Sequence, residues 1–161
     1  MISFTQFLAE SKEGDGTYAS VTFTSGSTKQ LRDIQKQYGI PNPLQRNKFH
    51  STLIYSRNVL KDVDSKDLRL PLDTKSFVME EWDQRNGKTC LVLKYESEWM
   101  KERHDFYRSI GGTHDFDSYT PHITLSYDLE DKAGQFNGKT VELNLTLARE
   151  VVEPLNTEWS K

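Results

Sequence analysis

Two short segments of this chain each carry a histidine and a threonine two positions apart. Segment 50–55 reads His-Ser-Thr-Leu-Ile-Tyr, and segment 122–127 reads His-Ile-Thr-Leu-Ser-Tyr. Both are rich in β-branched and aromatic residues, which predicts strands. Positions two apart on a strand share a face, so His50 is expected beside Thr52, and His122 beside Thr124. The remaining large side chains of the two segments are predicted to turn into the core: Leu53, Tyr55, Ile123, Leu125 and Tyr127.

A pair of histidines with hydroxyl groups beside them suits chemistry at a phosphate. An imidazole titrates near neutrality, so one histidine can take a proton from an attacking hydroxyl while the other protonates the departing oxygen. Either histidine can fill either role. The threonine hydroxyls can donate to the non-bridging phosphate oxygens and stabilise the charge that develops there. This scheme requires no metal and no other cofactor.

A zinc site is the alternative for the same two histidines. It would need a third protein ligand, and the chain has neither a His-Glu-x-x-His motif nor a second cysteine beside Cys90. The other two histidines, His104 in a predicted helix and His114 in a predicted loop, are expected to be surface or loop residues.

Length and composition predict one α+β domain over residues 1–161. The net charge is −3 and the pI is about 5.8, which argues against binding to long nucleic acid but is compatible with a small anionic ligand in a cleft. A single cysteine excludes an intramolecular disulfide and indicates a reducing compartment. No apolar run approaches the roughly 20 residues that span a bilayer. We therefore expect a cytoplasmic protein with no membrane partner.

The order of predicted elements repeats along the chain. Strand, helix, His-x-Thr strand and a further strand occur in 17–85 and again in 88–155, and each motif histidine follows a helix-ending glycine, Gly39 or Gly111, at the same separation. Residues 57–73 are predicted to be turn-rich, and 141–152 one long strand. Such a duplication predicts two pseudo-symmetric antiparallel sheets that flank a central cleft, with a helix on each outer face. Residues 1–15 are predicted to be a separate short N-terminal segment.

The two motifs and the duplicated unit resemble the 2H phosphoesterase superfamily, which is named for paired His-x-Thr/Ser motifs. The resemblance covers roughly residues 17–155 and implies a metal-independent phosphodiesterase, in which His50 and His122 are the acid–base pair and Thr52 and Thr124 bind the phosphate. Residues 1–10 also resemble the short leader that large tailed phages remove after a Leu/Ile-x-Glu triplet, here Leu8-Ala9-Glu10.

Within the superfamily, size, acidic pI and leader resemble the phage anti-CBASS nucleases. That resemblance implies cleavage of cyclic di- and trinucleotide signals in the host bacterial cytoplasm. It also implies base contacts by Tyr18, Trp82 and Glu150, which occupy the matching strand positions. Two alternatives remain: a phosphodiesterase acting on 2′,3′-cyclic phosphate ends or 2′–5′ linkages of RNA, and a non-catalytic nucleotide sponge or packaged virion protein.

Overall fold

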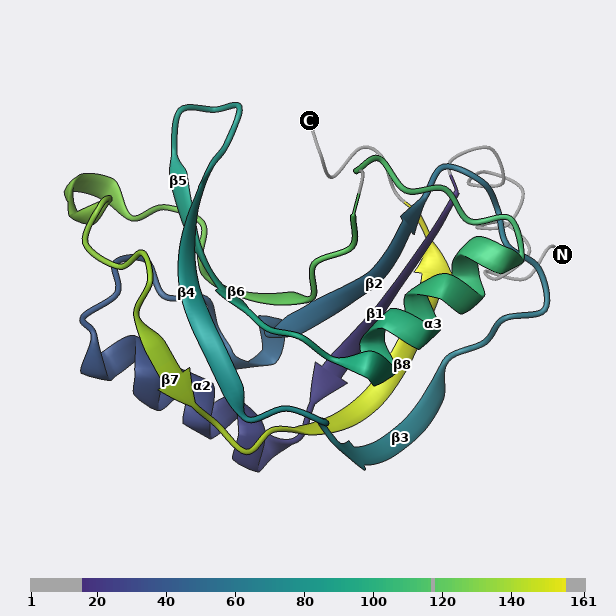
Figure 1. Ribbon diagram of the computed structural model, residues 1–161, viewed down its shortest axis with the longest axis horizontal. Coiled ribbons are helices and arrows are strands. Elements are labelled where there is room, and N and C mark those ends of the chain that lie inside the picture. The colour runs from purple at the N-terminus through teal and green to yellow at the C-terminus, as the bar shows by residue number, and fades with distance from the viewer. Residues whose placement is uncertain (1–15, 117, 156–161) are drawn as a thin grey trace, which may run out of the picture.

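The computed structural model describes residues 16–116 and 118–155, which form two antiparallel sheets of four strands each (Figure 1). In spatial order, the first sheet contains β2 (His50–Ser56), β1 (Thr17–Phe23), β8 (Thr146–Pro154) and β3 (Lys66–Pro71). The second contains β6 (His122–Ser126), β5 (Thr89–Lys94), β4 (Ser76–Asp83) and β7 (Thr140–Glu142). The predicted N-terminal segment and its leader-like triplet lie outside the described residues.

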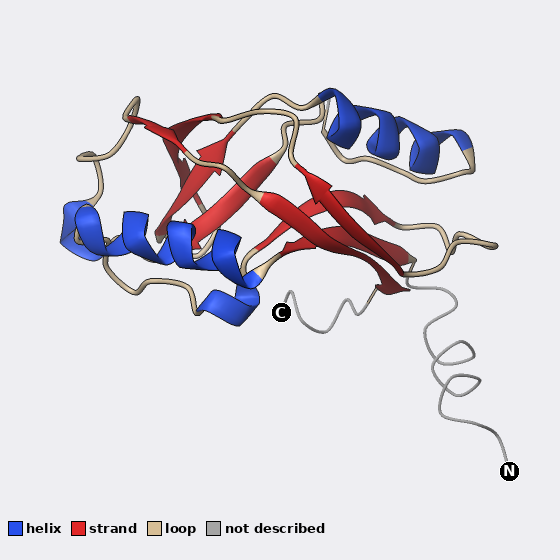
Figure 2. Ribbon diagram, turned by 90° about the horizontal axis from the view of Figure 1, so that it is seen from below, coloured by secondary structure: helices blue, strands red, loops and turns tan. Residues whose placement is uncertain are grey.

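The helices lie on the outer sides of the two sheets (Figure 2). They are α2 (Ser25–Gln37) and α3 (Glu98–Ser109), and short 3-10 turns occur at η1 (Arg46–Lys48) and η2 (Glu130–Lys132). The predicted fold class, two pseudo-symmetric sheets with a helix outside each, is confirmed. Neither helix in the described part of the chain is long and apolar enough to cross a membrane.

The sheets do not follow the predicted division of the chain into lobes at 17–85 and 88–155. Strand β8 belongs to the second repeat but pairs with β1, and β4 belongs to the first repeat but pairs with β5. The final strand of each repeat has therefore crossed to the other sheet. The segments 17–85 and 88–155 therefore do not each form one sheet, because each sheet contains strands from both halves of the chain.

Two further predictions about strands are wrong. The segment 141–152 is not one strand, because the chain leaves the second sheet after β7 and enters the first sheet at β8. Residues 57–73 contain β3, which was predicted as turns. Strand β3 is an edge strand that pairs with β8 and leaves most of its side chains exposed. The alternating Leu68 and Leu70 are only half-buried and stand among charged residues, so the strand pattern is short and weak in the sequence.

Each helix is tied to the strand that carries one of the two motifs. The Gln35 side chain of α2 donates to the carbonyl of Leu125 in β6 at 2.9 Å, and the His104 Nδ1 of α3 lies 2.7 Å from the carbonyl of Leu53 in β2. Both polar side chains are buried, at 1% and 5% exposed. Because Leu53 and Leu125 directly follow the motif threonines, these bonds hold the two motif strands in equivalent ways.

Candidate active site

The two motif strands meet at their first residues. Ser51 in β2 donates to the main-chain carbonyl of His122 in β6 at 2.5 Å. The hydroxyl of Tyr95 lies 2.7 Å from the same serine oxygen and, since the serine proton is already used, donates to it. Ser51 is fully buried. A residue adjacent to one motif histidine therefore binds the main chain of the other, which brings the first residues of the two motif strands together.

Both histidines are oriented by the same local hydrogen bond. Nδ1 of His50 lies 2.8 Å from the carbonyl of Lys48, and Nδ1 of His122 lies 2.9 Å from the carbonyl of Thr120. In each case the acceptor is two residues upstream. A carbonyl can only accept, so Nδ1 carries the proton and Nε2 is left free on the other edge of the ring. Each neutral imidazole therefore offers a basic nitrogen.

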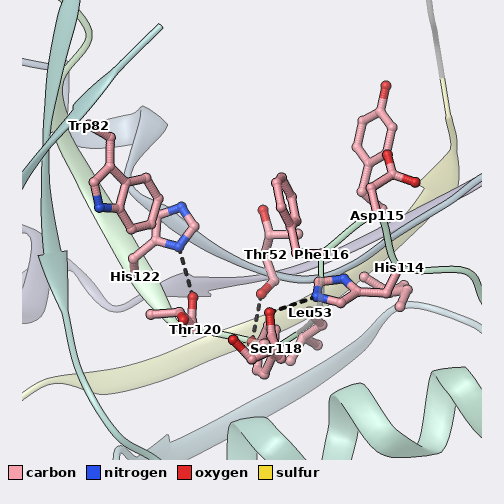
Figure 3. Close-up of a pocket in the computed structure, with 12 residues that line it drawn as sticks. Thr52, Leu53, Trp82, His114, Asp115, Phe116, Ser118, Thr120 and His122 are labelled. Carbon is pink, nitrogen blue, oxygen red and sulfur yellow. Dashed lines mark hydrogen bonds between the residues drawn. The ribbon is translucent and has the colours of Figure 1, made fainter.

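His122 is the more enclosed of the two histidines. Its ring lies edge-on to Trp82 with centroids 4.5 Å apart, and the two side chains form one end of the site (Figure 3). Burial lowers the pKa of His122 below its ordinary value; the hydrogen bond to Thr120 opposes this shift, and the nearby His50 adds to it. This shift favours the neutral form of His122, which is the form that can accept a proton.

The threonine of the first motif is held by Tyr18 of β1. The Tyr18 hydroxyl lies 2.8 Å from Thr52 Oγ1, and the Tyr18 ring lies edge-on to His50 at 6.4 Å between centroids. Burial raises the pKa of Tyr18 to about 12, so its hydroxyl keeps a proton at neutral pH. Thr124 of the second motif is 9% exposed. Tyr18 thus lies beside the first His-Thr pair.

A bulge in each motif strand changes the orientation of the final motif tyrosine. Opposite β1, the pairing passes from Thr52 to Ile54 and skips Leu53; opposite β5, it passes from Thr124 to Ser126 and skips Leu125. An extra residue reverses the alternation of side chains beyond it. Tyr55 therefore shares a face with Thr52 and lies edge-on to Tyr18 at 6.1 Å, and Tyr127, which follows β6, is 48% exposed.

The prediction that Tyr55 and Tyr127 point into the core is therefore wrong. Leu53, Ile123 and Leu125 are fully buried, as predicted.

A cavity of about 640 Å³ opens beside the motifs, within the range typical of ligand sites (Figure 3). Two motif residues, Thr52 and His122, line it together with Trp82, whereas His50 and Thr124 do not belong to its lining. The rest of its wall comes from the end of β2 and from the loop before β6: Leu53, Ile54, Tyr55, His114, Asp115, Phe116, Ser118, Tyr119 and Thr120. The predicted site residue Trp82 therefore lies at the cavity, and the loop wall was not predicted.

Glu150 does not lie at the cavity, so its predicted contact with a base is wrong. Its side chain is fully buried and bonds to Arg103 of α3 at 2.6 and 3.1 Å, and to the hydroxyl of Tyr107. Glu150 pairs with Val21 in the sheet, and both side chains face α3 rather than the cleft. The alternation along β8 therefore gives this carboxylate a structural partner on the outer face.

The prediction for His104 is also wrong, because this residue is buried rather than exposed. Its ring stacks on Tyr119 with 4.1 Å between centroids and 3° between planes, and it meets His114 edge-on at 4.6 Å. Burial lowers the pKa of His104; the hydrogen bond to Leu53 opposes this shift, and His114 adds to it. His114 is a loop residue, as predicted. Within the described residues, no three His, Cys, Asp or Glu side chains are grouped as metal ligands are.

Two facing antiparallel sheets, paired His-x-Thr strands and outer helices define the fold of the 2H phosphoesterases. Solved structures with the same fold include Escherichia coli LigT in complex with 3′-AMP, at 16% identity and a TM-score of 0.50, covering 89% of this chain and 96% of that one. A second protein, described as a phosphoesterase, gives 14% identity and a TM-score of 0.50 over 89% of this chain and 97% of that one.

The sequence comparisons identify the family within this fold. The family model described as "Anti-CBASS protein Acb1" matches residues 15–161. The anti-CBASS protein Acb1 of Salmonella phage S16 is 38% identical over 147 residues, covering 91% of this chain and 92% of that protein. The corresponding protein of Enterobacteria phage T4 is 39% identical over 146 residues, covering 90% and 91%. The chain belongs to the anti-CBASS protein Acb1 family, which confirms the family resemblance drawn from its size, acidic pI and leader.

Proposed function

We propose that this protein is a metal-independent phosphodiesterase that opens the 3′–5′ linkages of cyclic di- and trinucleotide signals in the host cytoplasm, and so evades a CBASS defence. The observation that carries this proposal is the pair of histidines, each with Nδ1 held by a carbonyl and Nε2 free, on two strands joined by Ser51. Membership of the anti-CBASS family supports the choice of substrate class.

The reaction divides between the two imidazoles. Nε2 of neutral His122 removes the proton of a ribose 2′-hydroxyl, and that oxygen attacks the adjacent 3′-phosphorus. The bond from phosphorus to the 5′-oxygen of the next nucleotide breaks, and protonated His50 gives its proton to that oxygen. The ring opens to a linear nucleotide with a 2′,3′-cyclic phosphate end, and proton exchange with water restores both histidines.

The hydroxyl groups stabilise the phosphorane that forms between the histidines. Tyr18 donates to Thr52 Oγ1, which leaves the proton of Thr52 free for a non-bridging phosphate oxygen. Thr124 provides the equivalent hydroxyl from the second motif. In this proposal, Trp82 and Tyr18 contact the bases on the two sides of the scissile phosphate, and their positions edge-on to the motif histidines support this role.

The substrate class and the absence of a metal requirement are tested in one experiment. Protein treated with EDTA is incubated with cyclic dinucleotides, 2′,3′-cyclic mononucleotides and 2′–5′ oligoadenylate, and the products are identified by mass spectrometry. We expect turnover of the cyclic dinucleotides at the rate of untreated protein. Loss of activity that zinc or manganese restores would overturn the metal-free mechanism, and turnover of only the other substrates would overturn the proposed substrate class.

The pH dependence of kcat/KM tests the assignment of His122 as the base. We expect a bell-shaped profile between about pH 5 and 8, as two histidines produce. Because the pKa of His122 is lowered, His122 becomes protonated only at a pH below the ordinary histidine value of about 6.5. The acidic limb of the profile, where protonation of the base stops the reaction, should therefore lie below that pH. Thermal unfolding across the same pH range controls for loss of structure. A flat profile, or an acid limb above pH 7, would contradict this assignment.

A further inference from the structure

One wall of the cavity is formed by the loop that runs from the end of α3 to β6. Phe116 lies on this loop and lines the cavity although 76% of it is exposed. Figure 3 shows its ring standing between Thr52 and the His114–Asp115 side, across the cavity from Trp82 and His122. Aromatic side chains commonly line ligand sites, and a ligand that enters this cavity can cover the exposed ring of Phe116.

The loop is fixed to the end of β2 on the N-terminal side of Phe116. Arg57 donates to both carboxylate oxygens of Asp115, from Nε at 3.2 Å and from Nη2 at 2.9 Å. The main chain of Arg57 also donates to Thr113 Oγ1 at 2.7 Å, and the main chain of Thr113 donates to Ser56 Oγ at 3.1 Å. The residue directly before Phe116 is therefore held by a bidentate ion pair.

A second set of contacts fixes the loop on the C-terminal side. The Tyr119 hydroxyl donates to the main-chain carbonyl of Thr52 at 2.7 Å, and its ring stacks on the buried His104. His114 closes the loop through Nε2, which lies 3.0 Å from the carbonyl of Ser118. The loop thus rests on the main chain of a motif threonine and on α3. Phe116 is presented from a loop anchored on both sides, which reduces the entropy that binding would have to overcome.

We propose that Phe116 is a substrate-binding residue whose ring stacks on a nucleobase of the bound nucleotide, in the part of the cavity bounded on its far side by Trp82. This inference rests on the proposed function and adds to it a binding residue on the loop. Stacking on an aromatic ring accepts any base, and a purine covers more of the ring than a pyrimidine does. The ligand class is therefore a nucleotide whose base enters between the loop and β4.

The test compares Phe116→Ala, Phe116→Tyr and the parent with cyclic di-AMP and cyclic di-UMP. We expect Phe116→Ala to raise KM about 5- to 150-fold, the equivalent of one lost base stack, with kcat nearly unchanged. The increase should be larger for the adenine substrate, and Phe116→Tyr should restore most of the affinity. Phe106→Ala is the matched control, because Phe106 is also a partly exposed phenylalanine, 38% exposed on α3, and does not line the cavity.

Binding is measured separately from turnover by titrating the same cyclic dinucleotides into His50→Ala protein, with and without Phe116→Ala. A weaker affinity only in the double variant supports the stack. Equal affinity and equal KM in parent and Phe116→Ala would overturn the inference while leaving the phosphodiesterase in place. Binding without any turnover by the parent would overturn the proposed function alone. Failure of parent and His50→Ala protein to bind either nucleotide would overturn both.

Discussion

Replacing His122 by alanine is expected to reduce kcat with a cyclic dinucleotide by a factor of about 10²–10⁴, and replacing His50 should do the same. Each imidazole transfers one proton in the proposed reaction, so its removal takes away that transfer. Both rings are only partly buried, so the fold should survive their removal. Single-turnover kinetics measures the chemical step, and circular dichroism verifies the fold.

The remaining cavity histidine offers a matched comparison. His114→Ala removes an imidazole that lines the same cavity, but its Nε2 already contacts the carbonyl of Ser118. We expect this variant to keep most of kcat. The double variant His50→Ala/His122→Ala should be little slower than either single variant, because the two groups act as a unit. Parent-like rates in either single motif variant would contradict the acid–base pair.

Replacing Glu150 by alanine is expected to lower the free energy of unfolding by about 3–5 kcal/mol. The carboxylate is fully buried, and its loss would leave the Arg103 guanidinium, with a side chain only 22% exposed, without its partner. Tyr107 would lose its acceptor as well. Urea denaturation followed by tryptophan fluorescence measures the change. KM of the folded variant should stay close to the parent value, because Glu150 faces α3.

Glu153 serves as the control for this prediction. It is an exposed carboxylate on the same strand, paired with Tyr18, and Glu153→Ala should change stability by no more than about 0.5 kcal/mol. A Glu150→Ala protein with unchanged stability and a strongly raised KM would restore the role that the family resemblance suggested for Glu150, and it would contradict the buried contacts described above.

Much of the site could be predicted because it depends on local periodicity. The His-x-Thr spacing places an imidazole and a hydroxyl on one face of a strand whatever the strand packs against. The repeated element order predicted two equivalent units, and the strands and helices of the structure follow this repeated order along the chain. Tyr18 and Trp82 each lie edge-on to a motif histidine, and their predicted contacts with bases remain a prediction.

By itself, the sequence determined the two motifs, the duplicated order of elements and the family, because each is encoded within a few adjacent residues or in overall similarity. Only the tertiary structure decided which sheet received β4 and β8, since a strand can complete either sheet with the same side-chain pattern. It also decided the bulges that turn Tyr55 and Tyr127 outward, the burial of Glu150 against Arg103, and the loop that carries Phe116. These features depend on partners far away in the chain, and the side-chain pattern of a single strand or loop does not specify its partner.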